Sequence, residues 1–198
     1  MFMQSNGSDN VMPMMLDAKP VLLLVDLQQA VDHSSWGPRN NPAAESNVAR
    51  LLEKWRARAL PIIHVRHDSS EPQSTYRPGQ AGNEFKPEAM PRPHETVLPK
   101  RTNSAFIGTG LEQLLRTNGY STLVVVGVSS SNSVEATVRM SGNLGFRTYL
   151  VEDGTWSFDK RDWGGRLRTA QEVHDMSLAN LNGEYCTVVN TDWVLSQL

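Results

Sequence analysis

Short apolar runs alternate with stretches of helical periodicity along most of the chain. Residues 21–26 are apolar up to a final carboxylate, and residues 123–126 form a continuous apolar run that stops at Gly127. Such runs are typical of strands buried on both faces of a parallel sheet. The six expected strands are residues 21–26, 61–66, 96–98, 123–126, 148–151 and 187–189.

Helical patterns lie between these runs, with apolar positions three and four residues apart. They cover residues 48–55, 111–115, 134–141 and 173–181, and the last residues suit a terminal helix. This alternation predicts one parallel sheet with helices on both faces, a three-layer α/β/α fold with six strands. We expect residues 1–17 to be a poorly ordered leader and residues 18–198 to be a single domain.

Two long segments interrupt the alternation. Residues 67–94 hold five prolines and little periodicity, and residues 153–168 hold Trp156, Phe158 and Trp163. Long loops in compact domains are often functional covers. Because an exposed tryptophan is unusual, we expect the aromatic side chains of the second segment to pack over a pocket.

Composition narrows the classes of function. The chain has 198 residues and a net charge of −2, without a block of Lys and Arg, which argues against nucleic acid as a partner. No apolar run approaches the ~18 residues of a membrane span. The first residues do not resemble a secretory signal, and a single cysteine excludes an internal disulfide. We therefore expect a cytoplasmic protein that acts on a small molecule.

The hydroxyl-rich stretch after residues 123–126 is the strongest candidate for chemistry. It places Ser133 in the first turn of a helix, just beyond the carboxyl end of a buried strand. Backbone N–H groups at such a turn lack helical partners, so they can stabilise an oxyanion beside a nucleophile. An ordinary polar turn between strand and helix is the alternative.

Other reactive side chains follow neighbouring strands. Asp26 ends the first expected strand, and Lys100 follows the third. Since sites in open parallel sheets form at the carboxyl ends of strands, these groups can meet Ser133 at one edge. A carboxylate after five apolar residues needs a partner, and Lys100 is the natural one. A purely structural ion pair is the alternative reading.

These segments together resemble the isochorismatase-like hydrolases, also called the cysteine hydrolase superfamily. The resemblance spans nearly everything after residue 18. The matching pieces are residues 24–28 (LVDLQ), 97–106 (VLPKRTNSAF), 127–137 (GVSSSNSVEAT), 143–146, 151–154, 177–185 and 188–192. It implies a six-stranded parallel sheet, a catalytic aspartate at Asp26 and a catalytic lysine at Lys100. It also implies a cis peptide at Val128–Ser129 that aims backbone N–H groups at the oxyanion, and assembly into dimers or tetramers.

The chain departs from the family at the nucleophile. Many relatives place a cysteine where this chain has Ser133, and the one cysteine here, Cys186, opens the last expected strand as a small buried hydrophobe. Three possibilities stay open. Ser133 acts as the nucleophile, the reaction needs no nucleophile, or the serine replaces a cysteine in a variant made to trap a complex. A serine hydroxyl needs a general base, and Asp26 would have to supply it.

The resemblance and the residues together predict a small-molecule hydrolase that acts on an amide or carbamoyl-type C–N bond. Asp26 is the acid and base, Lys100 positions it, and Ser133 is the nucleophile or an orienting hydroxyl. The backbone N–H groups of Ser129 and Ser133 form the oxyanion hole. Further expected substrate contacts are Gln28, Asp68 and Trp156, with Phe106 in the pocket wall.

Two alternatives belong to other mechanisms. A true isochorismatase would use Asp26 as an acid on a vinyl ether, and its dianionic substrate would need cationic groups such as Arg66, Arg77 or Arg101. A catalytically disabled homologue would only bind a small molecule. Retention of both Asp26 and Lys100 argues against the second alternative.

We expect neither a metal nor another cofactor. Relatives that hydrolyse nicotinamide use an Asp-x-His pattern after the second strand, and His64, His67, Asp68 and His94 lack that spacing. His64 should point away from the side of His67 because side chains alternate along a strand. His67 and His94 fall in the long segment and are expected to lie outside the chemistry.

Overall fold

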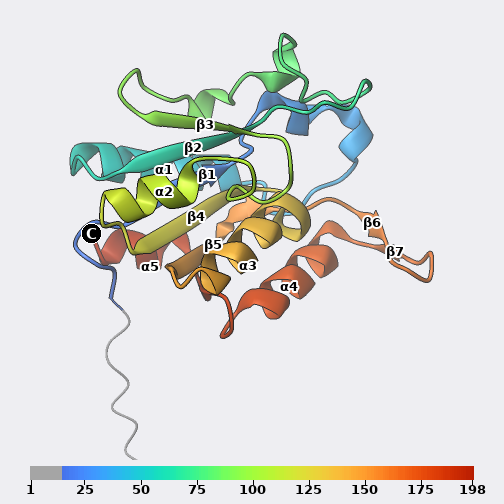
Figure 1. The fold of residues 1–198 in the computed structure, drawn as a ribbon. Helices are drawn as coiled ribbons and strands as arrows, with labels where there is room; N and C mark the ends of the chain where they lie inside the picture. Colours follow the sequence, from blue (N-terminus) through green and yellow to red (C-terminus); the bar gives the residue numbers. More distant parts are fainter. Residues whose placement is uncertain (1–14) are drawn as a thin grey trace, which may run out of the picture.

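The six predicted apolar runs form one parallel sheet in the computed structural model, which describes residues 15–198 (Figure 1). Neighbouring strands pair in parallel in the order β3-β2-β1-β4-β5-β8. The strands are β1 (Val21–Val25), β2 (Ile62–His67), β3 (Thr96–Lys100), β4 (Thr122–Val128), β5 (Arg147–Trp156) and β8 (Thr187–Val189).

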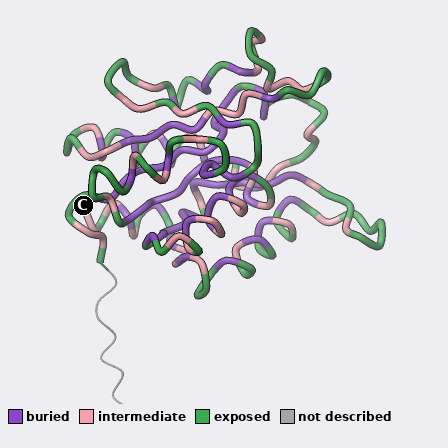
Figure 2. Tube along the Cα trace, viewed as in Figure 1, coloured by how far each residue is buried: buried purple, intermediate pink, exposed green. Residues whose placement is uncertain are grey.

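Helices cover both faces of this sheet, so the predicted three-layer α/β/α fold is confirmed. The helices are α1 (Ala44–Ala57), α2 (Leu111–Thr117), α3 (Glu135–Asn143), α4 (Ala170–Leu181) and α5 (Thr191–Ser196). Apolar residues of α1 and α5 pack on one face, and those of α2, α3 and α4 pack on the other. Figure 2 shows the consequence, with buried residues along the central strands and exposed residues on the outer loops.

The structure differs from the sequence-based prediction in some element boundaries and in the exposure of some side chains. The third strand continues through Pro99 to Lys100, and proline fits there because β3 is an edge strand. Met176, one of the apolar positions of the predicted helical pattern over residues 173–181, is 63% exposed. Thr169 caps that helix and forms a capping box with Glu172, which starts α4 three residues before the predicted pattern begins.

The two long segments differ in character. Residues 67–94 contain the short 3₁₀ turns Ala81–Asn83 and Pro87–Ala89 and pack beside the sheet. The second segment first extends β5 to Trp156 and then forms a hairpin of β6 (Lys160–Arg161) and β7 (Leu167–Arg168), which projects from the body (Figure 1).

The predicted leader lies mostly outside the described residues, which begin at Met15. The last part of it is anchored rather than loose. Asp17 accepts hydrogen bonds from Thr122 and from Ser121 and pairs with Arg147 at 2.8 Å. The domain therefore includes residues 15–17.

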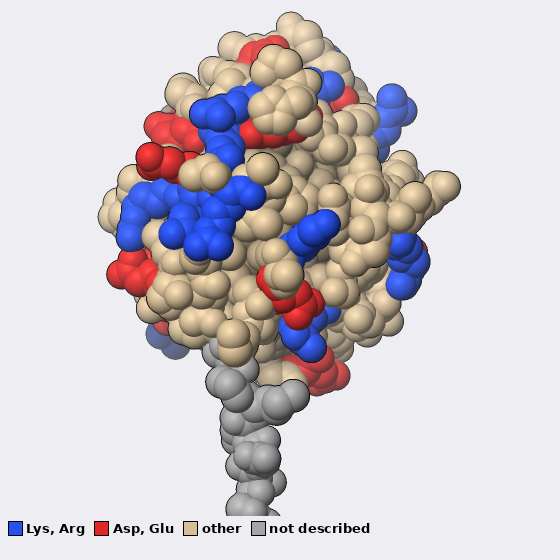
Figure 3. Space-filling model, turned by 90° about the vertical axis from the view of Figure 1, so that its left-hand side faces the viewer, with Lys and Arg blue, Asp and Glu red and all other residues tan. Residues whose placement is uncertain are grey.

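The described surface carries charges of both signs. On the face in Figure 3, basic side chains gather in small groups bordered by acidic ones, and much of the surface is neither. This mixture agrees with the net charge of −2. Within residues 15–198, no helix has the length and apolar character needed to cross a bilayer.

Candidate active site

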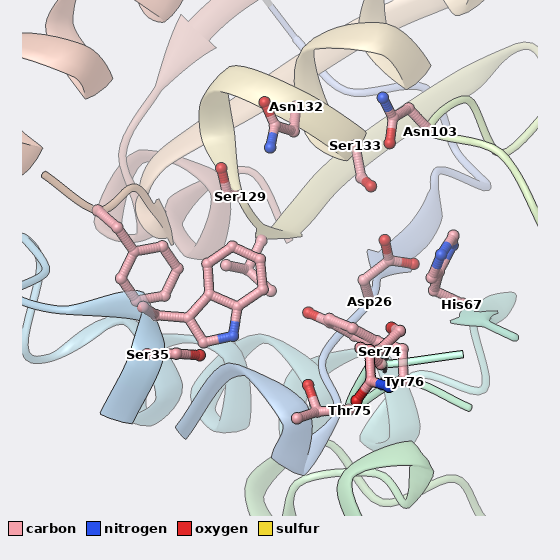
Figure 4. Close-up of a pocket in the computed structure, with 14 residues that line it drawn as sticks. Asp26, Ser35, His67, Ser74, Thr75, Tyr76, Asn103, Ser129, Asn132 and Ser133 are labelled. Atoms are coloured by element: carbon pink, nitrogen blue, oxygen red, sulfur yellow. Dashed lines mark hydrogen bonds between the residues drawn. The ribbon is translucent and has the colours of Figure 1, made fainter. Parts of the chain in front are cut away.

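A cavity of about 340 Å³ opens at the carboxyl ends of β1, β2 and β4, where the sequence predicts the site (Figure 4). Asp26 and Ser133 both line it, and Lys100 lies directly behind them. The lining residues are Asp26, Ser35, Trp36, His67, Gln73, Ser74, Thr75, Tyr76, Asn103, Val128, Ser129, Asn132, Ser133 and Phe158.

Asp26 follows β1 with a φ of 54°, in the left-handed region where aspartate is better tolerated than most residues. Its side chain is 5% exposed, and Oδ2 lies 2.7 Å from Lys100 Nζ. Oδ1 has no hydrogen-bond partner among the described residues. Burial raises the pKa of Asp26 despite the opposing effect of Lys100. The carboxyl group therefore binds a proton more readily than an ordinary aspartate, and Oδ1 is the oxygen left free to take it.

Lys100 is the last residue of β3, and its side chain is fully buried. Nζ donates hydrogen bonds to Asp26 Oδ2, to the carbonyl oxygen of Thr102 at 3.0 Å and to Ser133 Oγ at 3.2 Å. An ammonium group has three donors and no acceptor, so these three bonds use all of them. Because Ser133 Oγ accepts from Lys100, the hydrogen of its own hydroxyl remains free to be donated elsewhere.

His67 pairs with Lys100 in the register of β2 and β3, so both side chains lie on the same face of the sheet. Its Nδ1 lies 3.4 Å from Lys100 Nζ, and its ring packs edge-on against Tyr76. Burial, together with the charge of Lys100, lowers the pKa of His67. The ring is therefore neutral beside the ammonium group. His67, which was expected to lie outside the chemistry, lines this cavity, whereas His94 lies away from it.

The strand-to-helix turn that carries Ser133 begins with a cis peptide bond at Val128–Ser129. One wide π-helical turn, Ser130–Val134, then leads into α3. Gly127 allows this path, because its φ is +135° and a Cβ there would overlap the carbonyl oxygen of Val25. Figure 4 shows the Ser133 hydroxyl pointing toward the Asp26 carboxylate.

Side chains of α4 hold the same turn from behind. His174 Nδ1 lies 2.7 Å from Ser130 Oγ, and Ser177 Oγ donates to the Ser130 carbonyl oxygen at 2.8 Å. Nε2 of His174 faces the amide nitrogen of Asn41 at 3.5 Å. Both hydrogens of that amide already reach the carbonyl oxygens of Glu152 and Thr155, so these contacts are compatible with a neutral His174 ring in either tautomer. Burial lowers the pKa of His174, which favours this neutral form.

An aromatic wall closes the other side of the cavity. Trp36 stacks on Phe158 with ring centres 5.1 Å apart, and Tyr76 meets the same indole edge-on. Of the aromatic side chains in the second long segment, Phe158 packs over a pocket as predicted, whereas the prediction was wrong for Trp163, which is fully exposed. Trp36 and Tyr76 were not predicted, because they come from loops with no periodicity that would place them.

The four side chains predicted to meet substrate do not line this cavity. Gln28 is buried and clamps the strand end instead, since its amide donates to the carbonyl oxygens of His67 and Asn83 and accepts from the N–H of His67. Asp68 pairs with Arg66 at 2.9 Å.

The two aromatic candidates are parts of the core. Phe106 stacks on Phe146 with ring centres 5.8 Å apart, among the residues under α2 and α3. Trp156 is completely buried, and the guanidinium of Arg39 lies 4.0 Å from the centre of its ring. Both side chains therefore belong to the hydrophobic core and do not form part of the cavity surface.

Charge around the cavity is sparse. Among the described residues that line it, Asp26 is the one carboxylate and no Lys or Arg is present. Arg66, Arg77 and Arg101, the candidates for binding a dianion, lie outside the lining. His64 is turned away as expected, with Nε2 2.9 Å from Glu95. Within residues 15–198, no three His, Cys, Asp or Glu side chains are grouped closely enough to hold a metal ion.

Known proteins resemble this chain over most of its length. Residues 20–192 match the family model described as Isochorismatase domain. The chain is 39% identical over 181 residues to the isochorismatase family protein YrdC of Bacillus subtilis, covering 91% of this chain and 97% of that protein. It is 26% identical over 197 residues to maleamate amidohydrolase of Pseudomonas putida, with coverage of 91% and 87%. A crystal structure of an isochorismatase-family protein from Chromobacterium violaceum is 66% identical, has a TM-score of 0.91 and covers 94% of this chain and 98% of that one.

Proposed function

The chain belongs to the isochorismatase family and is a hydrolase, and on that premise we propose that it cleaves the C–N bond of a small uncharged amide or carbamoyl compound. Asp26, Lys100 and Ser133 carry the reaction in this proposal. The observation that supports it most is the position of Lys100 Nζ between Asp26 Oδ2 and Ser133 Oγ, 2.7 Å from one and 3.2 Å from the other. The similarity to maleamate amidohydrolase supports the choice of an amide.

In the first step, Ser133 Oγ attacks the carbonyl carbon of the substrate and gives its proton to Asp26 Oδ1. The raised pKa of Asp26 makes this carboxylate a stronger base than an ordinary aspartate. Lys100 holds both oxygen atoms in place and offsets the negative charge. Backbone N–H groups of Ser129 and Ser133 are the proposed donors to the oxyanion.

In the second step, the tetrahedral intermediate collapses and the C–N bond breaks. Asp26 returns its proton to the leaving nitrogen, which departs as ammonia or an amine and leaves an ester on Ser133. A water molecule then attacks the ester carbonyl, gives a proton to Asp26, and the ester oxygen of Ser133 takes that proton back. The carboxylic or carbamic acid leaves, and the enzyme is restored.

The uncharged substrate follows from the cavity lining. Hydroxyl and amide groups face an aromatic wall, and no cationic side chain is present among the described lining residues. An anionic substrate would meet the Asp26 carboxylate without a compensating charge at the surface of the cavity. A flat, neutral carbonyl compound that packs on Trp36 fits this environment.

Vinyl-ether hydrolysis is the second candidate, because the raised pKa of Asp26 also suits a general acid. The absence of Arg and Lys from the described lining disfavours the dianionic substrate of that reaction. A disabled homologue that only binds a small molecule is the third candidate, and the buried Asp26–Lys100 pair argues against it.

Hydrolysis assays on a defined panel separate these candidates. The probes are the neutral amides acetamide and benzamide, monoamides that carry one carboxylate, and isochorismate. We expect ammonia release from a neutral amide, a loss of at least ~10³-fold in kcat for Ser133→Ala and a similar loss for Asp26→Asn. Full activity of Ser133→Ala on isochorismate, with none for Asp26→Asn, would establish the vinyl-ether mechanism instead. Activity only in Ser133→Cys would establish a disabled site.

A further inference from the structure

The imidazole of His67 lines the active-site cavity, and the proposed reaction gives it no role. His67 is the last residue of β2, and Figure 4 shows its ring beside the carboxyl group of Asp26. Its backbone is held firmly by the Gln28 side chain, which accepts from the His67 N–H at 2.8 Å and donates to the His67 carbonyl oxygen at 3.1 Å. The ring therefore projects from a fixed point at the edge of the sheet.

Two neighbours set the orientation of this ring. Nδ1 faces Lys100 Nζ at 3.4 Å, and Tyr76 packs edge-on against the ring, with ring centres 5.4 Å apart. Nε2 points away from Lys100 and has no hydrogen-bond partner within residues 15–198. It is also not one of the buried side-chain atoms that lack a partner. Nε2 is therefore accessible from the cavity that the ring lines.

The charge of Lys100 decides which ring nitrogen carries the hydrogen. Burial lowers the pKa of His67, so the ring is neutral and holds one hydrogen. An ammonium group has donors and no acceptor. A hydrogen on Nδ1 would face this positive charge, whereas the lone pair of Nδ1 is attracted to it. The contact thus assigns the hydrogen to Nε2, where it forms a donor that opens into the cavity.

We propose that His67 selects the substrate by donating a hydrogen bond from Nε2 to an uncharged acceptor, such as a carbonyl oxygen, that lies beside the scissile amide. This inference rests on the proposed amide hydrolysis and narrows its substrates to amides that carry a second acceptor. A simple amide such as benzamide would leave the Nε2–H group without a partner. Sites built to bond a polar group reject analogues that lack it, because the group of the protein then stays unpaired.

The fixed state of the ring is what makes it selective. The hydroxyl and amide side chains in the rest of the lining can each donate or accept, so they adapt to different substrates. The His67 ring cannot adapt in this way, since Lys100 holds its tautomer and Tyr76 packs against its edge. An uncharged acceptor fits better than an anionic one, because Asp26 lies close enough to act on the charge of His67.

Matched amides measure this selectivity. Acetylbenzamide and isopropylbenzamide, each substituted at position 3 or 4 of the ring, have nearly the same shape and differ by a carbonyl oxygen in place of a methyl group. We expect one acetylbenzamide to exceed its isopropyl partner in kcat/KM about tenfold or more in the wild type. The acetyl group also changes the intrinsic reactivity of the amide. The ratio is therefore compared between variants, because this intrinsic effect is the same in each of them.

Two substitutions separate the two ring nitrogens. His67→Asn places an amide oxygen near the position of Nδ1 and keeps an acceptor for Lys100, but it leaves no donor at the position of Nε2. His67→Gln places an amide nitrogen near Nε2 and loses the contact to Lys100. We expect the ratio to fall about tenfold in His67→Asn and to stay within about threefold of wild type in His67→Gln. A ratio that is unchanged in His67→Asn, as a purely structural role toward Lys100 predicts, would overturn the proposal.

Binding to the Ser133→Ala variant separates this inference from the proposed reaction. Long-range ¹H–¹⁵N NMR of that variant at pH 7.5 should show the His67 hydrogen on Nε2, and titration with the preferred acetylbenzamide should shift this nitrogen more than its isopropyl partner does. The same preference without amide hydrolysis by the wild type would refute the reaction and leave the role of His67 in place. A hydrogen on Nδ1, or no preference for either amide, would overturn the role of His67 whether or not the amides are cleaved.

Discussion

The ammonium group of Lys100 lies 2.7 Å from the carboxylate of Asp26, and none of the lysine side chain reaches solvent. The pair is buried, so removing one partner would leave an uncompensated charge in the interior. Several buried side-chain atoms have no hydrogen-bond partner among the described residues. Of these, Asp26 Oδ1 is the one whose side chain lines the cavity. In the proposed mechanism, the lysine fixes the reactive groups and the aspartate exchanges the proton.

A thiol placed at residue 133 should report the charge of Lys100. We expect Ser133→Cys to react with iodoacetamide at pH 7 faster than an ordinary thiol of pKa ~8.5, because the neighbouring ammonium group stabilises the thiolate. The wild-type chain is the control, since burial raises the pKa of Cys186 to about 12 and keeps it unreactive. Adding Lys100→Met should slow alkylation about tenfold or more. Equal rates with and without Lys100 would show that its charge does not act on this position.

Position 127, just before the turn that carries Ser133, should tolerate only glycine. Gly127→Ala combines a positive φ with overlap against the carbonyl oxygen of Val25, so we expect a loss of several kcal/mol in the free energy of unfolding, beyond the ~1 kcal/mol typical of a left-handed position. Gly145→Ala is the matched control, because Gly145 also has a positive φ but has no atom within 4 Å of the added Cβ. Urea unfolding measures both. Equal losses would mean that the close approach of β1 and β4 is unimportant.

Protonation of Glu95 should lower the stability of the protein at acidic pH. Although burial alone would raise its pKa, hydrogen bonds from Arg56, from the Arg92 N–H and from His64 lower it to about 2. The carboxylate therefore contributes stability above its unfolded pKa of ~4.5, and that contribution is lost as the pH falls toward 2. We expect wild type to exceed Glu95→Gln by roughly 2–3 kcal/mol at pH 6 and by little near pH 2. A difference independent of pH would refute this assignment.

His174 should stabilise the turn only while it is neutral. Burial lowers its pKa, against a smaller opposing effect of Asp175, so the unfolded chain takes up a proton first as the pH falls below ~6.5. The stability advantage of wild type over His174→Gln should therefore be greater at pH 7.5 than at pH 5. Urea unfolding at the two pH values checks the sign. In the Ser133→Cys background, His174→Gln should also slow alkylation, which a purely structural role at a distance would not cause.

The sequence was sufficient to predict the sheet and the meeting of Asp26, Lys100 and Ser133. All three follow or end parallel strands, and the carboxyl ends of such strands converge at one edge. The same reasoning could have placed His67 at this edge, because His67 pairs with Lys100 in the register of β2 and β3. This prediction requires the pairing register of the edge strand β3, and the apolar pattern alone does not determine that register.

The remaining lining could not be predicted for a physical reason. Trp156 was expected at the site but ends a β5 strand whose pairing with β4 shifts between Val125 and Gly127, and it is buried in the core. Trp36 and Tyr76 come from irregular loops, whose paths depend on tertiary contacts such as the bond from Trp36 Nε1 to the Ala30 carbonyl oxygen. Local patterns carry no information about such contacts.

Capture of a covalent intermediate tests the central assignment of Ser133 most directly. The chain is mixed with p-nitrophenyl acetate, quenched in acid within the first turnover, and digested for mass spectrometry of the peptide that contains residue 133. We predict one acetyl group on Ser133, with a burst of one equivalent of p-nitrophenol, and neither in Ser133→Ala or Asp26→Asn. Steady hydrolysis by wild type without any acetylated Ser133, undiminished in Ser133→Ala, would contradict the account.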